Sequence, residues 1–114
     1  MGKKTVAVLF GSISSEYEVS LRSAASVLRN IPRDRYDVVM LGITKDGRWF
    51  EYAGSIDDIE SDRWLQNGPV TPAFISPDRG AGGILRLLPD GPQPVAVDAV
   101  FPVLPGQHSK ARAL

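Results

Sequence analysis

The chain has 114 residues, 43% of them hydrophobic and 23% charged, and this balance predicts one soluble globular domain with a single core. Thirteen basic and thirteen acidic side chains cancel, which argues against recruitment to nucleic acid or to an anionic membrane. The sequence has no cysteine, and its first apolar run is too short for a signal peptide or a membrane span. We therefore expect a cytoplasmic protein without disulfides.

The first predicted element is a strand from Thr5 to Phe10, an uninterrupted apolar run that ends at Gly11. Such runs are typical of strands covered on both faces in a parallel sheet. A second run of this kind extends from Val38 to Ile43, and an amphipathic segment separates the two. Strand, helix and strand in this order predict a right-handed βαβ unit, the start of an α/β sheet.

The segment between these strands has one apolar stripe. Its members recur at intervals of three and four residues: Tyr17, Leu21, Ala24, Leu28 and Ile31. Pro32 ends the pattern, and Ser15 and Glu18 at its start have the spacing of a capping box. We therefore predict a helix that begins near Ser15 and ends before Pro32.

Two shorter elements follow the second strand. Asp46-Gly47 stands between two strand-like segments and predicts a β-hairpin with a type I′ turn, in which both central residues have positive φ. Ser55 to Leu65 has a serine start and apolar residues at helical spacing, which predicts a short helix stopped by Gly68.

Glycine and proline are frequent from residue 69 to residue 94, and the apolar segments Ala73–Ile75 and Ile84–Leu88 predict an inserted β-hairpin there. The last apolar run, Val95 to Leu104, is expected to return to the parallel sheet, with Pro102 at a strand end or a sheet edge. The residues that follow, 105–114, are too few and too polar for the helix that usually crosses back over a parallel strand.

The entrance to the first predicted helix, after Gly11, is the candidate ligand site. A glycine loop before a helix can bind an anion, but the dinucleotide pattern would need glycines in place of Ile13 and Glu16, and the phosphate-loop motif is absent. Helix capping alone explains Ser15 and Glu18. Glu16 lies outside that pair, at the carboxyl end of a parallel strand, where open α/β sheets bind ligands. Its carboxylate suits an ammonium group.

The remaining polar and aromatic residues receive structural interpretations. His108, the only histidine, lies in the polar tail without a nearby carboxylate and is assigned no role. Trp49, Phe50 and Tyr52 are expected to pack on the sheet. The acidic run from residue 57 to residue 62 lacks the loop pattern of a calcium site and is interpreted as a solvated helix face. No metal or cofactor site is therefore assigned to this chain.

Three segments occur in order over residues 3–104: KKTVAVLFGSISSEYEVSLRSAASVL, GITKDGRWFEY and DAVFPVL. Together they resemble the N-terminal part of the D-alanine–D-alanine ligase family. The resemblance implies a pre-ATP-grasp domain, residues 1–104, with a Rossmann-like open parallel sheet and an inserted β-hairpin, followed by a short tail outside the family pattern at 105–114. It also implies that the intact enzyme uses ATP and Mg²⁺ to join two D-alanines for peptidoglycan through a D-alanyl phosphate.

The resemblance also assigns site residues. In this family the first glutamate of the S-x-E-x-E-V-S-L element helps to hold the ammonium group of the first D-amino acid, and that glutamate corresponds to Glu16. Val19 and Ser20 would belong to the same substrate surface. Where Tyr17 stands, the family has histidine or another residue, and its vancomycin-resistance members include tyrosine variants.

The end of the chain departs from the family. Leu104-Pro105-Gly106 replaces the family's Leu-His-Gly, and the ATP-gripping lysines, the magnesium-binding carboxylates and the acceptor D-alanine site that follow in the family have no counterpart here. We therefore expect a fragment that binds D-alanine weakly or not at all and does not catalyse ligation alone. The alternative is a non-enzymatic Rossmann-like binding or interaction module, in which Glu16 is only a helix-end charge.

Self-association is a further expectation. The strand predicted for residues 95–104 lacks a crossover helix and a neighbouring strand, and an uncovered apolar strand favours association. The partner could extend the sheet at this edge, within the limits set by Pro102 and Pro105, or it could bury Val97, Val100 and Val103 against an apolar surface.

Overall fold

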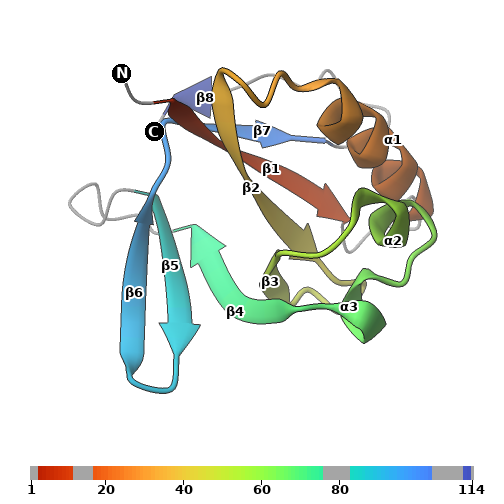
Figure 1. Cartoon of the computed structure of the whole chain (residues 1–114). Coiled ribbons are helices and arrows are strands. Elements are labelled where there is room, and N and C mark those ends of the chain that lie inside the picture. The colour runs from red at the N-terminus through yellow and green to blue at the C-terminus, as the bar shows by residue number, and fades with distance from the viewer. Residues whose placement is uncertain (1–2, 12–16, 76–82, 104–111, 114) are drawn as a thin grey trace.

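The computed structural model describes residues 3–11, 17–75, 83–103 and 112–113, the last two through their backbone only. The helices and strands that these residues form are shown in Figure 1. In chain order they are β1 (Lys4–Gly11), α1 (Tyr17–Asn30), β2 (Tyr36–Ile43), β3 (Trp49–Tyr52), α2 (Ile56–Glu60), α3 (Trp64–Asn67), β4 (Val70–Ile75), β5 (Gly83–Leu88), β6 (Gly91–Ala96), β7 (Ala99–Pro102) and β8 (Arg112–Ala113).

One open sheet contains all the described strands, in the order β6-β5-β4-β3-β2-β1-β7-β8. β1 lies between β2 and β7 and is parallel to both, whereas the other neighbours pair antiparallel. α1 connects β1 to β2, and β4 and β5 form the inserted hairpin. The predicted α/β open sheet is therefore confirmed, with its parallel part limited to the three adjacent strands β2, β1 and β7.

Both faces of β1 are covered, as its continuous apolar run predicted, because alternate residues of a strand face opposite sides of the sheet. Phe10 belongs to a core cluster with the three helices. Leu9 belongs to a second cluster with Ala73 of β4 and Ile84 of β5. The curved β4 (Figure 1) and its partner β5 thus cover the face of the sheet that helices would cover in a doubly wound fold.

A bidentate ion pair connects the hairpin to β3. Nε and Nη2 of Arg86 on β5 donate to the two carboxylate oxygens of Glu51 on β3, at 2.5 and 2.9 Å. Nη1 of Arg86 also donates to Gln93 on β6 at 2.7 Å. Only 28% of the Arg86 side chain and 15% of the Glu51 side chain are exposed. This geometry and partial burial make the pair stronger than a typical surface ion pair.

The turn between β2 and β3 differs from the prediction. Gly47 has a φ of 87°, but Asp46 lacks the positive φ that a type I′ turn requires. The amide of Thr44 donates to Arg48 O at 2.8 Å, so three residues form the loop. The carboxylate of Asp46 accepts hydrogen bonds from the side chains of Thr44 and Arg48, and these contacts favour the longer loop.

The helix predicted for residues 55–65 is divided into α2 and α3. Ser55 caps α2 as predicted, and Gly68, with a φ of 51°, ends α3 as predicted. Between the two helices Asp62 adopts a φ of 60°, which an α-helix cannot include. The break turns Trp64 into the core, where its side chain is fully buried. Burial of the indole therefore outweighs helix continuity.

The last apolar run divides between two strands. Its first residues end β6, which the sequence did not predict because Pro92 and Pro94 argue against a strand. β6 forms the edge of the sheet, where a missing proline N–H costs no ladder hydrogen bond. Pro102 ends β7, as predicted.

β7 is not the uncovered strand that the sequence predicted. Its outer edge pairs with β8 at Ala99 and Val100. Val97, Val100 and Val103 are only 7%, 6% and 4% exposed within the single chain. The expectation that these valines need a partner is therefore wrong, because the two core clusters of the same chain already cover them.

Candidate functional site

The carboxyl ends of the parallel strands meet beside the start of α1 (Figure 1). Gly11 ends β1 with a φ of 78°, and a Cβ added there would lie 2.1 Å from Ile43 O at the end of β2. Only glycine permits this conformation and this approach of the two backbones. The close approach of the ends of β1 and β2, where the ligand site is predicted, therefore depends on Gly11.

Ser20 joins α1 to the ends of β1 and β7. Its Oγ accepts a hydrogen bond from Gly11 N at 3.1 Å and donates one to Val103 O at 2.6 Å. The side chain is fully buried, where a hydroxyl without partners would be unfavourable. Sequence reasoning grouped Ser20 with the substrate surface. In the structure its hydroxyl is bonded to the backbone of Gly11 at the end of β1 and of Val103 just after β7.

Of the other two predicted site residues, the structure describes only Val19, in the first turn of the same helix. Val19 points away from the core and is 39% exposed. Glu16 lies outside the described residues, as does Ser15, so the ammonium contact of Glu16 and the capping box stay predictions. Glu18 forms an ion pair with Lys45, whose Nζ lies 2.8 Å from Oε2 and lowers the pKa of the carboxyl. Both side chains are at least half exposed, so solvent screens this pair.

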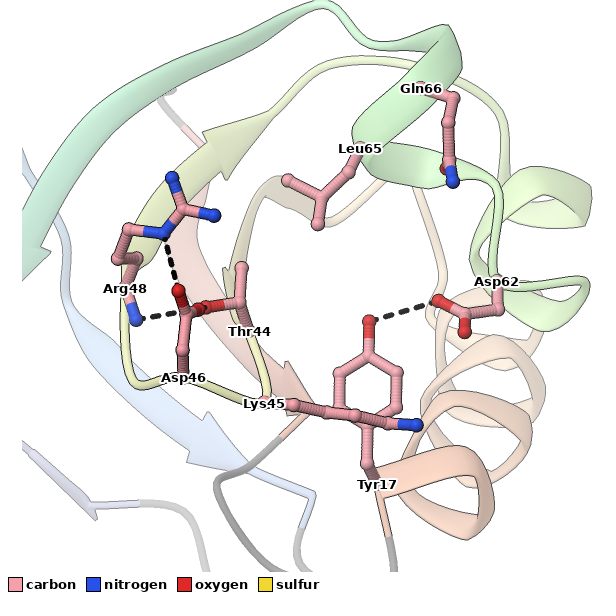
Figure 2. Close-up of a pocket in the computed structure, with 8 residues that line it drawn as sticks. All are labelled: Tyr17, Thr44, Lys45, Asp46, Arg48, Asp62, Leu65 and Gln66. Atoms are coloured by element: carbon pink, nitrogen blue, oxygen red, sulfur yellow. Dashed lines mark hydrogen bonds and ion pairs between the residues drawn. The ribbon is translucent and has the colours of Figure 1, made fainter.

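A pocket of about 320 Å³ opens between α1, the β2–β3 turn and the α2–α3 segment (Figure 2). It is lined by Tyr17, Thr44, Lys45, Asp46, Arg48, Asp62, Leu65 and Gln66. Two cationic and two anionic side chains balance one another in this lining. The pocket therefore does not concentrate one sign of charge, as a phosphate site would.

The phenol of Tyr17 forms one wall of the pocket (Figure 2), and two side chains form hydrogen bonds with its hydroxyl. Trp64 Nε1 donates to Tyr17 Oη at 2.9 Å, and Tyr17 Oη donates to Asp62 Oδ1 at 2.9 Å. Burial is the main reason that the pKa of Tyr17 is raised to about 12; the Asp62 carboxylate adds to the rise, and the Trp64 hydrogen bond opposes it. Tyr17 is therefore a neutral donor at physiological pH.

The opposite wall is the β2–β3 turn. Arg48 Nε donates to Asp46 Oδ2 at 3.0 Å, and the Thr44 hydroxyl donates to the other carboxylate oxygen. These contacts, the one with Thr44 first, lower the pKa of Asp46. The Nζ atom of Lys45 lies 5.2 Å from the centre of the Tyr17 ring, so a cation lies over one face of the ring.

Sequence reasoning missed the contact between Tyr17 and Asp62. It assigned Tyr17 to an apolar stripe and Asp62 to a solvated acidic run, and no local spacing signals a hydrogen bond across 45 residues. Elsewhere in that run, Asp57 and Glu60 form exposed ion pairs with Arg29 on α1. Across the residues that the structure describes, no group of three or more possible metal ligands occurs.

The aromatic residues of β3 pack as predicted. Tyr52 is buried in the cluster beneath the helices, Phe50 packs against the same cluster, and Trp49 packs against the cluster on the other face. Among the described helices, none has the length and apolar character needed to cross a bilayer.

The fold is that of an α/β domain in which β1 lies between two parallel neighbours, β2 and β7. A family model described as the D-ala D-ala ligase N-terminus matches residues 5–110. The chain therefore belongs to the D-ala D-ala ligase N-terminus family.

Individual relatives agree with this assignment. The D-alanine--D-alanine ligase of Caldicellulosiruptor bescii is 41% identical over 110 residues, which cover 96% of this chain and 29% of the relative. That of Clostridium novyi is 44% identical over 108 residues, which cover 95% of this chain and 28% of the relative. The chain thus spans less than a third of the length of these enzymes.

Solved structures also match. The VanG D-Ala:D-Ser ligase from Enterococcus faecalis superposes with a TM-score of 0.81 at 36% identity, covering 89% of this chain and 29% of that one. The D-alanine-D-alanine ligase from Coxiella burnetii gives a TM-score of 0.73 at 24% identity over 90% of this chain and 29% of that one, and supports the fold alone.

The raised pKa of Tyr17 predicts a pH-dependent stability. An unfolded tyrosine ionises near pH 10, and folded Tyr17 near pH 12, so its stabilising contribution is present below pH 10 and is lost between pH 10 and 12. The loss should reach roughly 2 to 3 kcal/mol. We expect the difference in free energy of unfolding between wild type and Tyr17→Phe to shrink over this range in urea titrations. A difference that stays constant from pH 9 to pH 12 would contradict the buried, neutral phenol.

Proposed function

We propose that this chain is the N-terminal domain of an ATP-dependent D-alanine–D-alanine ligase of the ATP-grasp class and forms one wall of the first D-alanine site. The family match over residues 5–110 carries the proposal. The position of Ser20 beside the carboxyl ends of β1 and β7 supports it, because open α/β sheets bind ligands at this edge.

Glu16, Val19 and Ser20 would form the substrate surface. The carboxylate of Glu16 would bind the ammonium group of the first D-alanine, since a charge-assisted hydrogen bond favours that pairing. Val19 is exposed enough to contact a ligand. Ser20 would contribute by holding the backbone of β1 and β7 in place, because both of its hydrogen bonds go to these strands.

The other components of the reaction would be supplied by the rest of an intact enzyme. ATP and Mg²⁺ would bind there and supply the phosphoryl group that activates the first D-alanine, and the dipeptide would serve peptidoglycan synthesis in the cytoplasm. The 114-residue chain alone would bind D-alanine weakly and form no dipeptide, since it supplies only one wall of the site.

Self-association also stays a proposal, on a different surface from the one that the sequence suggested. Phe74 of β4 and Leu87 of β5 are 36% and 43% exposed. Phe74 pairs with Leu85, and residues two apart on a strand share a face, so the two exposed side chains lie on one face of the hairpin. Light scattering at micromolar concentrations tests this, and a strictly monomeric chain would refute it.

A chimeric enzyme tests the proposed function. Residues 5–103 of this chain would replace the matching segment of the Caldicellulosiruptor bescii ligase, and D-alanine-dependent phosphate release from ATP would be measured. We expect activity, and we expect Glu16→Gln to raise the Michaelis constant of the first D-alanine by about 10-fold or more, because a charge-assisted hydrogen bond is lost. The Michaelis constant of ATP should not change.

Glu18→Gln is the matched control in this chimera. Glu18 pairs with an exposed lysine on the protein surface, so its neutralisation should leave the Michaelis constant of the first D-alanine within about twofold. A folded chimera that binds ATP but releases no phosphate with D-alanine would contradict the proposed function. Equal kinetic damage from the two substitutions would contradict the assignment of Glu16.

A further inference from the structure

Hydrogen bonds from two side chains hold the first turn of α1 in place. Ser20 binds it to the ends of β1 and β7, and Tyr17 binds it to Asp62 and Trp64 on the α2–α3 segment. Residues three apart on a helix lie on the same side, about 5 to 6 Å from each other. The hydrogen bonds of Ser20 and Tyr17 therefore act on one helical turn, and together they leave that turn little freedom to shift or rotate.

Trp64, which donates a hydrogen bond to Tyr17, is itself held rigidly. Trp64 is fully buried, and its ring packs edge-on against Phe10 and Tyr52, with ring centres 4.9 and 5.9 Å apart. The position of its indole N–H, which donates to Tyr17, is therefore set by the core. The partner on the other side, Asp62, is held in an unusual conformation.

Asp62 is the only non-glycine residue with positive φ in the part of the chain that the structure describes. Such a conformation is unfavourable for most side chains and persists where the surrounding structure requires it. Here it ends α2 and directs the carboxylate to the Tyr17 hydroxyl, as Figure 2 shows. Asp62 follows the C-cap residue Ser61, a position where helices commonly end in this conformation, and the end of α2 therefore places the carboxylate that accepts the hydrogen bond of Tyr17.

We propose that Tyr17, held by Asp62 and Trp64, is a positioning residue for the first D-amino-acid site. It fixes the start of the helix that carries Val19 and Ser20 and that is joined directly to Glu16. This inference rests on the proposed function. It makes the α2–α3 segment, which supplies no predicted substrate contact, a determinant of first-substrate affinity.

Tyr17→Phe in the chimera tests the inference, since it keeps the ring and removes both hydrogen bonds. We expect the Michaelis constant of the first D-alanine to rise about tenfold, with kcat and the Michaelis constant of ATP within about twofold of wild type. In the 114-residue chain, amide hydrogen exchange at residues 19–21 should be faster in the variant than in wild type.

Tyr52→Phe is the matched control. It also removes a buried phenol hydroxyl from the same aromatic cluster, but that hydroxyl donates to Ser55 O and does not contact α1. We expect it to leave the Michaelis constant of D-alanine unchanged. At position 62, Asn keeps an acceptor and tolerates positive φ, so Asp62→Asn should retain substrate affinity and Asp62→Ala should lose it.

The outcomes separate the two proposals. A folded wild-type chimera that binds ATP without D-alanine-dependent activity overturns the proposed function. An active wild-type chimera in which Tyr17→Phe leaves the Michaelis constant of D-alanine within twofold overturns the positioning role. The same holds if Tyr52→Phe raises that constant as much as Tyr17→Phe, because the effect would then be a general loss of stability.

Discussion

The hydroxyl of Ser20 is the contact on which the candidate site depends. It accepts a hydrogen bond from the last residue of β1 and donates one to Val103, just after β7, while its own backbone lies in α1. One buried group thus sets the relative position of three elements at the carboxyl ends of the parallel strands, where the substrate surface is proposed. Gly11 makes this possible, because any side chain there would collide with the carbonyl oxygen of Ile43.

The rest of the fold supports this edge from both faces of the sheet. On one face, α1 packs over Phe10, and the interrupted α2–α3 segment brings Trp64 beneath the start of α1. On the other, β4 and β5 fold back over the parallel strands, and the ion pair between Arg86 and Glu51 holds them there. In the described part of the chain, helices cover one face of β1 and the strands β4 and β5 cover the other, so its last residues are buried from both sides.

The sequence predicted the features that follow from local periodicity and turn chemistry. The apolar runs of β1 and β2 and the stripe of α1 were predicted in this way, and the class of fold follows from their order. It did not predict β6, whose prolines are tolerated only because the strand lies at an edge, or the break at Asp62, which the burial of Trp64 favours. The hydrogen bonds of Tyr17 and Ser20 join residues 45 and 83 positions apart, and no local pattern reveals them.

Ser20 acts by holding the ends of β1 and β7 beside α1. The free energy of unfolding of Ser20→Ala in the 114-residue chain tests this role most directly. Removal of the hydroxyl leaves a buried amide and a buried carbonyl without this partner, so the account predicts a loss of about 1 to 3 kcal/mol. Ser26→Ala, at an exposed position of the same helix, should change the free energy of unfolding by less than about 0.5 kcal/mol. Equal stability of the two variants in urea titrations would contradict the claim.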